Sequence, residues 1–397
     1  ELTVDQKRFL ADLGDAGAIA YYPFADSVRY TSDRILYEKI DTIYNNKIYT
    51  IYKYSTNPEA QLFSPSFTYL GAYKGNYQLV SSTANGRVFA WIAPENGTPQ
   101  GEYEPVLLLT APTSQQMATL GIDLSVRDNT LITSELAVSH YDINTFSKKD
   151  RQNDVGFAYQ FGFSDKEFLG SRQDSLQWQC ISQVRWQFVH KNFTPLESFR
   201  EVEFARNYNL ASDYAKNRSE SWLQAGVTVS KPTRHLFRYD LNWFDRVGES
   251  NALRNELVTD DHWQTWHLRT QNSYLLSQDS IQNTRYLVSR FQLSDRTKWL
   301  LFDFDNLLEH NIFRNQSNRQ IRPNSFAFND FTASVRSVES ARHQWLLAYK
   351  NRVEWTPDSS ALRPHLMVNE VKTQYRFAQI HNQSFTLNAT YRHQSYL

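Results

Sequence analysis

The chain has 397 residues, with 42 basic and 42 acidic side chains and a formal net charge of zero, which gives no reason to expect nucleic acid as a partner. Aromatic residues make up 15% of the chain, yet its mean hydropathy is −0.60. No window approaches the roughly 18 consecutive apolar residues of a membrane helix. A helical membrane protein is therefore excluded. A membrane β-barrel is not, because only alternate residues of its strands are apolar.

Cysteine usage limits the chemistry further. Cys180 is the only cysteine, which excludes an intramolecular disulfide framework and a cysteine metal cluster. It falls on the apolar face of a predicted strand, where we interpret it as a small hydrophobic residue. The chain begins at Glu1. Since a barrel needs a secretory signal, we expect a processed chain or a segment of a longer protein.

The first part of the chain, residues 1–115, predicts a small β-rich domain outside the membrane. TVDQKRFLADL at residues 3–13 fits an amphipathic helix, and DTIYNNKIYTIYKY predicts a hairpin that turns at Asn45-Asn46. Three later segments place an aromatic residue shortly after Gly75, Gly86 and Gly101, which is typical of successive short strands. A domain of this size cannot bury all of its aromatic residues. We expect the surplus to form a docking surface or, alternatively, to cap the mouth of a barrel.

The second part, residues 116–397, shows sustained alternation of apolar and polar residues. SLQWQCISQVRWQF at Ser175–Phe188 places aromatic and apolar side chains on one face of an extended strand and Gln and Arg on the other. The pattern recurs in about thirteen segments. It predicts an all-β fold, an antiparallel transmembrane β-barrel of about 14 strands. Bacterial barrels usually have even numbers of strands, so one strand is missed or the chain continues past Leu397.

The connections between these strands fall into short turns and long polar loops, as in barrels of the outer membrane. We interpret four segments as long loops: residues 142–153, 191–220, 248–261 and 311–325. The alternation of short and long connections fails near Ser294–Thr297, which indicates an error in one assignment.

The two strand faces give the candidate residues for the barrel interior and for its lipid contact. We expect these polar side chains to face the lumen: Gln177, Gln179, Gln183, Arg185, Gln187, Arg238, Asp240 and Arg352. We expect these aromatic side chains to face lipid or form interfacial girdles: Trp178, Trp186, Trp243, Phe157 and Phe161. A large soluble β-sandwich or propeller, with the aromatic faces inward, is the alternative.

The loop at residues 191–220 mixes aromatic residues with paired charges in PLESFREVEFARNY, which predicts a folded element. We expect it to lie outside the cell, packed on the barrel rim or on a partner through Phe199, Val202, Phe204 and Tyr208.

The strands and two longer stretches carry a resemblance to a known group. SELAVSHYDINTFSKKDRQNDVGFAYQFGF at 134–163 and PLESFREVEFARNYNL at 195–210 resemble large outer-membrane β-barrels of Bacteroidota, a group of Gram-negative bacteria. The likeness covers about the last two-thirds of the chain and transfers no active-site residues. It implies an outer-membrane location and membership of a multiprotein surface complex for secretion, barrel assembly or nutrient transport. The plug domain and energy-coupling box of the iron and glycan transporters are not recognisable in the sequence.

The sequence contains one partial match to a catalytic motif. Asp260 and His262 share a strand face, as do Asp303 and Asp305, and these pairs are loosely similar to the Asp-His and Asp-Asp pairs of omptin proteases. The surrounding sequence differs, and carboxylates are common at a solvated rim, so we interpret them as rim residues. We expect no catalytic site, no cofactor and no metal.

Three functions remain open from the sequence. The first is a non-enzymatic accessory or scaffold barrel in an outer-membrane assembly or secretion complex, with outer-membrane lipid and other outer-membrane proteins as partners. The second is a porin-like channel or uptake barrel. The third is an enzyme or surface adhesin. Channel conductance separates the first two.

Overall fold

The structure is a computed structural model that describes residues 2–83, 85–170, 177–208, 210, 218–232, 234–338, 342–358, 360–378 and 384–397. It divides into two units. The first unit comprises Glu1–Gln116 and His140–Asp154, and the second comprises Met117–Ser139 and Val155–Leu397. The first unit is therefore discontinuous, because a segment between two strands of the second unit belongs to it.

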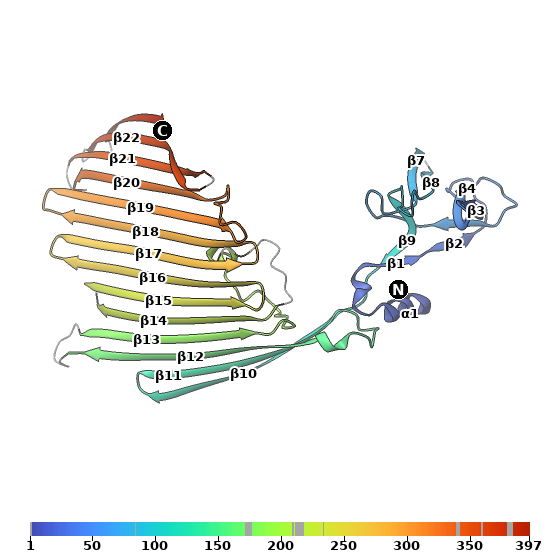
Figure 1. Cartoon of the computed structure of the whole chain (residues 1–397), viewed down its shortest axis with the longest axis horizontal. Coiled ribbons are helices and arrows are strands. Elements are labelled where there is room, and N and C mark those ends of the chain that lie inside the picture. Colours follow the sequence, from blue (N-terminus) through green and yellow to red (C-terminus); the bar gives the residue numbers. More distant parts are fainter. Residues whose placement is uncertain are drawn as a thin grey trace. The chain divides into compact units, whose positions relative to one another are not determined.

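Among its described residues, the first unit contains one α-helix, two 3-10 helices, the second of which is η2 (Arg151–Asn153), and two small antiparallel sheets (Figure 1). One sheet has the order β1-β9-β7-β8, with β6 paired to β9, and the other has the order β2-β5-β3-β4. Its elements are α1 (Val4–Leu13), η1 (Gly14–Ile19), β1 (Ala20–Pro23), β2 (Ala25–Val28), β3 (Tyr37–Tyr44), β4 (Lys47–Tyr54), β5 (Leu62–Pro65), β6 (Phe67–Tyr69), β7 (Tyr77–Thr83), β8 (Gly86–Trp91) and β9 (Tyr103–Leu109).

Local sequence explains the hairpin predicted in this unit. Asn45 and Asn46 have φ values of 48° and 59°, the left-handed conformation that a two-residue hairpin turn requires and that Asn adopts more readily than most residues. Tyr44 pairs with Lys47 across the turn. The predicted hairpin at Asn45-Asn46 is confirmed.

Helix α1 is held at both ends by side chains. At its start, the Thr3 hydroxyl accepts from the Gln6 amide, and the Gln6 side chain accepts from the Thr3 amide, a complete capping box. At its end, Gly14 has φ +62°, and the loop at residues 143–154 supplies donors to the last carbonyls. The Asn144 side-chain amide donates to Leu10 O at 2.7 Å and to Gly14 O at 2.8 Å. The carbonyl groups that a helix end leaves unpaired are thus satisfied from a segment distant in sequence.

The core of the first unit is largely aromatic. Phe67 lies against Phe89 and Tyr77, with ring centroids 4.5 Å and 4.9 Å apart. Tyr37 and Tyr77 are 2% and 3% exposed, and each buried hydroxyl accepts a backbone hydrogen bond, from Phe89 N and Tyr52 N respectively. These four aromatic residues therefore pack into a core in which the buried hydroxyls of Tyr37 and Tyr77 are paired.

The second unit is built on one 14-stranded antiparallel sheet in which consecutive strands pair in order, from β10 to β23 (Figure 1). The strands are β10 (Ser114–Arg127), β11 (Thr130–Asp142), β12 (Val155–Leu169), β13 (Trp178–Val189), β14 (Glu220–Lys231), β15 (His235–Arg246), β16 (Ser250–Trp263), β17 (Trp266–Asp279), β18 (Gln282–Arg296), β19 (Leu300–Asn315), β20 (Phe326–Ser337), β21 (His343–Pro357), β22 (Leu362–Ala378) and β23 (Ser384–Tyr396). Between β11 and β12 lies η2 (Arg151–Asn153), and between β13 and β14 lies α2 (Phe204–Asn207). Among the described residues, no helix is long and apolar enough to cross a membrane.

One predicted loop is a strand. Residues 248–261, expected to be a long polar loop, contain most of β16, which pairs with β15 and β17 along its length. The alternation is weak there because Asn255, Thr259 and Asp261 stand where neighbouring strands carry apolar side chains. Counting β16 raises thirteen strands to fourteen and removes the parity failure near Ser294–Thr297. Ser175 and Leu176, assigned to the strand that begins at Trp178, lie outside the described residues.

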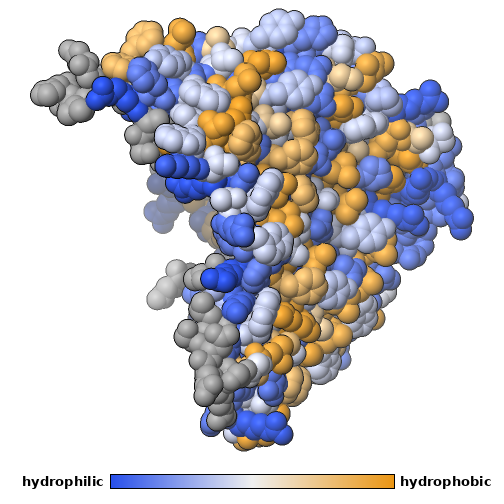
Figure 2. All heavy atoms as spheres, turned by 90° about the vertical axis from the view of Figure 1, so that its left-hand side faces the viewer, coloured by the Kyte–Doolittle hydropathy of each residue, from blue (hydrophilic) through white to orange (hydrophobic). Residues whose placement is uncertain are grey.

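The sheet has an apolar face and a polar face. Residues directly opposite in an antiparallel pair project to the same face, so the pairs Phe161–Trp186, Trp186–Leu223 and Leu223–Trp243 define one apolar row. Many side chains of this face remain accessible, among them Val184 at 36% and Phe237 at 47%. Apolar residues can be seen in patches on the surface in Figure 2, which faces the edge of the sheet where the short turns lie.

Candidate functional site: the polar face of the sheet

The polar face carries the residues predicted for the barrel interior. Gln179, Gln183, Arg185 and Gln187 alternate along β13, and strand pairing places Asp240 in the same row as Gln183. A second row, followed strand by strand, contains both Arg238 and Arg352. Gln177 precedes β13 by one residue. Trp178, Trp186, Trp243, Phe157 and Phe161 project to the apolar face. That these faces meet water and lipid stays a prediction.

Charges of opposite sign alternate on neighbouring strands of the polar face. One row runs from Asp260 through Arg269, Gln292, Asp305, Thr332, Lys350 and Glu370 to Arg392. Arg290 holds Asp305 with two hydrogen bonds of 3.1 Å and 2.7 Å. Arg352, on β21, donates hydrogen bonds to Asp330 at 2.8 Å and to Glu354 at 2.6 Å. The pairs Arg290–Asp305 and Arg352–Asp330 join neighbouring strands, whereas Arg352 and Glu354 lie on the same strand.

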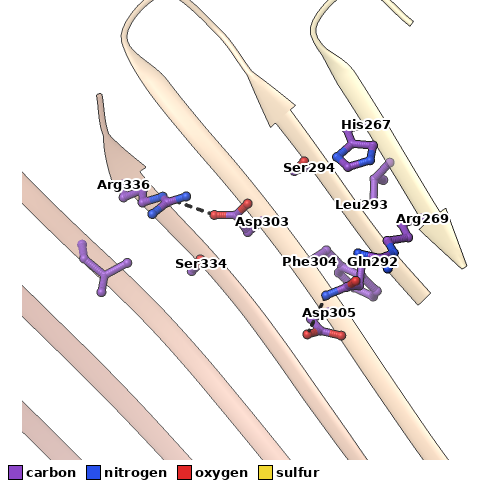
Figure 3. Close-up of a pocket in the computed structure, with 11 residues that line it drawn as sticks. His267, Arg269, Gln292, Leu293, Ser294, Asp303, Phe304, Asp305, Ser334 and Arg336 are labelled. Carbon is purple, nitrogen blue, oxygen red and sulfur yellow. Dashed lines mark hydrogen bonds and ion pairs between the residues drawn. The ribbon is translucent and has the colours of Figure 1, made fainter. Parts of the chain in front are cut away.

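The two candidate pairs, Asp260 with His262 and Asp303 with Asp305, lie on this face near the short-turn edge of the sheet. A cavity of about 430 Å³ is lined by both aspartates of the second pair and by His267 and Arg269, which lie opposite the first pair (Figure 3). Each carboxylate has a partner on a neighbouring strand. Asp303 lies 3.5 Å from Arg336, Asp305 is held by Arg290, and Asp260 lies 2.8 Å from the imidazole of His267.

The arrangement therefore does not reproduce a carboxylate pair poised to activate water. The carboxylate of Asp305 accepts two hydrogen bonds from Arg290, and that of Asp303 forms an ion pair with Arg336, so the oxygens of both are already engaged. The solvated-rim interpretation of these residues stays a prediction, and the geometry is consistent with it.

The opposite end of the polar face is covered by the segment at residues 190–210. The segment approaches the sheet closely at Gly156, where an added Cβ would lie 2.1 Å from Phe193 N. Farther along, Phe204 and Tyr208 pack against Phe244 and Leu275 in a buried cluster. Phe244 lies in the row of Gln187 and Trp222, so this cluster sits on the polar face. A predicted folded element in the loop is confirmed at α2.

Arg200 joins this segment to the sheet. Its guanidinium lies 4.6 Å from the ring centroid of Phe204 and 5.0 Å from that of Trp222, a cation–π arrangement. It also donates to Gln187 at 3.1 Å and to Glu220 at 3.3 Å. Sequence reasoning named Gln187 and Phe204 but missed Arg200 and Glu220, which join them. The signal was the apolar Trp222 and Phe244 at positions of their strands where the alternation requires polar residues.

Only part of the predicted partner loop is accessible. Phe204 and Tyr208 are 6% and 4% exposed, whereas Phe199 and Val202 are 51% and 98% exposed. Phe204 and Tyr208 pack on the sheet of their own chain, and packing of the loop on a barrel rim or on a partner stays a prediction. Contact of Phe199 and Val202 with a partner stays a prediction.

The chain matches no protein-family model, and no curated protein is significantly similar to it. Its function is therefore inferred from the two faces of the sheet and from what each face can contact.

Proposed function

We propose that the second unit is a transmembrane β-barrel of a Gram-negative outer membrane, with its apolar face toward lipid and its polar face toward the lumen. The proposal rests mainly on the accessible aromatic face of the 14-stranded sheet. Contiguous exposed apolar patches of soluble monomers rarely exceed a few hundred Å², and this face continues from strand to strand. An apolar medium outside the sheet supplies the missing cover.

In a lipid environment, the sheet is expected to close by pairing of its first and last strands. In lipid, the unpaired backbone groups of edge strands cost several kcal/mol each, and β10 and β23 are the two ends of the strand order. Because the strands alternate in direction and number fourteen, the first and last run in opposite directions and can pair in the same antiparallel way. An even strand number therefore supports a closed barrel.

Closure is tested by cross-linking in a Cys180→Ser background. Ile122→Cys in β10 is combined in turn with Leu387→Cys, Ala389→Cys and Tyr391→Cys in β23. We expect one combination to form a disulfide on oxidation in membranes, since this bond needs Cβ atoms about 3.5–4.5 Å apart. Ile122→Cys with Tyr274→Cys, in the middle of the sheet, is the control. Equal cross-linking in the control, or none in any combination, contradicts closure.

Within the membrane we propose a non-enzymatic accessory or scaffold role in a multiprotein outer-membrane assembly or secretion complex. Exposed apolar side chains outside the sheet support this role. Ile43 and Ile48 face each other across the hairpin of the first unit and are 74% and 66% exposed, and Tyr73 is 66% exposed. Accessible apolar groups of this kind mark protein interfaces.

The role is tested by extraction in mild detergent and mass spectrometry of co-purifying proteins. We expect partners with the unchanged chain and fewer with the double variant Ile43→Ser/Ile48→Ser. Thr50→Ser, an exposed position of the same hairpin, is the matched control. A chain that extracts alone at every detergent strength contradicts the proposal.

A porin-like channel is the second candidate, and the ion-paired polar face favours it. The segment at residues 190–210 favours the first, because it occupies space over that face. Planar-bilayer conductance separates the two functions: a scaffold with a filled interior is silent, whereas a porin conducts.

A further inference from the structure

The turn between β16 and β17 brings two histidines and an aspartate together. Trp263 pairs with Trp266 across the two-residue turn, so His262 lies directly opposite His267, and Asp260 lies opposite Arg269. Asp260, His262, His267 and Arg269 all project to the polar face. The histidines are five positions apart in sequence, and only the hairpin register makes them neighbours.

The donor atoms converge on one point. Nε2 of His267 lies 2.8 Å and Nε2 of His262 lies 3.4 Å from the same atom, Oδ1 of Asp260. The three ligand atoms lie within 4.8 Å of one another, and the two imidazole rings stack with centroids 3.9 Å apart. Ligand atoms about 2.0–2.2 Å from a zinc ion in tetrahedral geometry lie roughly 3.3–3.6 Å from one another. The imidazole rings must rotate out of their stacked arrangement to direct both Nε2 atoms at one ion.

We propose that Asp260, His262 and His267 bind a divalent transition-metal ion of the zinc class. Two imidazoles and one carboxylate suit Zn²⁺, Cu²⁺ or Ni²⁺ better than Mg²⁺ or Ca²⁺, which take oxygen ligands. Three protein ligands leave at least one coordination position for water or another ligand. The side chains are partly exposed, at 49% for His262, 36% for His267 and 31% for Asp260, so an ion can enter from solvent.

The surroundings suit such a site. Arg269 forms an ion pair with the other oxygen of Asp260, Oδ2, at 3.9 Å, which leaves Oδ1 to the histidines. The backbone amide of His262 donates to Arg234 O at 2.7 Å, which fixes the end of β16 against the neighbouring turn. His267 also lines the cavity of about 430 Å³, so a group bound at the vacant coordination position has space beside it.

Metal binding is tested on the full chain in detergent micelles, purified without a histidine tag. Zn²⁺ titration by calorimetry is expected to show one site per chain, and Co²⁺ is expected to give visible absorption bands at the same stoichiometry. His267→Asn and Asp260→Asn should each weaken binding more than about tenfold. His235→Asn is the matched control, since His235 pairs with Asp261 at 3.0 Å on the opposite face and should leave affinity unchanged.

A second measurement needs no variant. Bound Zn²⁺ should protect His262 and His267, but not His235, from modification by diethyl pyrocarbonate, as read by mass spectrometry of the peptides. The chain has ten histidines, so weak binding at several sites without protection of this pair overturns the proposal. Equal Zn²⁺ affinity of the His267→Asn variant and the unchanged chain also overturns it. Neither result depends on whether the sheet closes or spans a membrane.

Discussion

The two units use aromatic residues on β-strands in opposite ways. In the first unit, strands from two small sheets turn their aromatic side chains onto one another, and Tyr77 is 3% exposed. In the second, Phe291, Phe304 and Phe331 contact one another sideways along one face at 5.8 Å and 5.0 Å, yet Phe291 is 38% exposed. Ring contacts are similar in both. The two units differ in what buries the rings. Other side chains of the unit bury them in the first unit, whereas in the second unit the exposed side of the rings needs contact with something outside the chain.

The largest expected effect concerns Phe204, which lies in a buried aromatic cluster of the second unit, as the rings of the first unit do. Phe204→Ala removes a buried ring from the cluster on Phe244 and should cost about 3–5 kcal/mol of local stability. The segment at residues 199–208 then leaves the polar face. Faster hydrogen exchange of this segment and a rise in planar-bilayer conductance check the prediction. Val202→Ala, at a 98% exposed position, should change neither, and an unchanged exchange rate in Phe204→Ala contradicts it.

The next largest effect is a difference in stability between Arg substitutions on the two faces of one strand. Val184 and Gln183 are neighbours on β13 with similarly exposed side chains, so the isolated chain should tolerate Arg at either position. If the apolar face meets lipid, Val184→Arg costs about 2–4 kcal/mol near the bilayer centre, and Gln183→Arg costs far less. Urea titration of the chain folded into lipid vesicles measures both. Equal costs for the two variants remove the basis for assigning lipid to the apolar face.

A smaller effect tests the closed core of the first unit. Tyr77→Phe deletes the hydroxyl that accepts from Tyr52 N at 2.8 Å, and a part-buried amide without its partner costs about 1–3 kcal/mol. Hydrogen exchange of peptides from β4 should quicken in this variant. Tyr73→Phe, at a 66% exposed position, should leave exchange as it is. Identical rates in the two variants show that the hydroxyl does not stabilise the core.

The smallest effect is a pH dependence at Glu104. Burial raises the pKa of the Glu104 carboxyl, and hydrogen bonds from Asn76, at 2.8 Å and 2.5 Å, oppose that rise. With the folded pKa above the unfolded one, the stabilising contribution is full below the unfolded pKa and is lost as pH rises through the folded pKa. Glu104→Gln keeps an oxygen for Asn76 and should therefore stabilise the first unit at pH 7 but not at pH 3.

Denaturation of the first unit at the two pH values measures this difference. Glu59→Gln, an exposed position, is the control and should show no such gain. A gain for Glu104→Gln that is equal at both pH values contradicts the assigned cause.

The strands were predictable wherever one face was consistently apolar. In β13, the alternation from Trp178 to Phe188, interrupted only at Ile181 and Ser182, predicted both the strand and its faces, because the side-chain period of a strand is two. β16 was missed, since Asn255 and Thr259 interrupt its apolar row. The histidine pair was equally hidden, because Asp260 and His262 were visible as a local pattern but His267 joins them only through the register of a turn. Packing of Phe204 on the polar face depends on a segment folding back onto Phe244 and Leu275, which local periodicity does not encode.

The capping of α1 by the loop at residues 143–154 sets the order in which the chain can finish folding. The amide of Asn144 reaches the carbonyl of Leu10 from 134 positions along the sequence, so the first unit stays incomplete during synthesis until β10 and β11 have both emerged. Three chain crossings then tie it to the sheet, at the start of β10, the end of β11 and the start of β12. A single protease cut before β10 leaves the severed piece attached through the loop, and a fragment that stops at residue 115 lacks the groups that terminate its own helix.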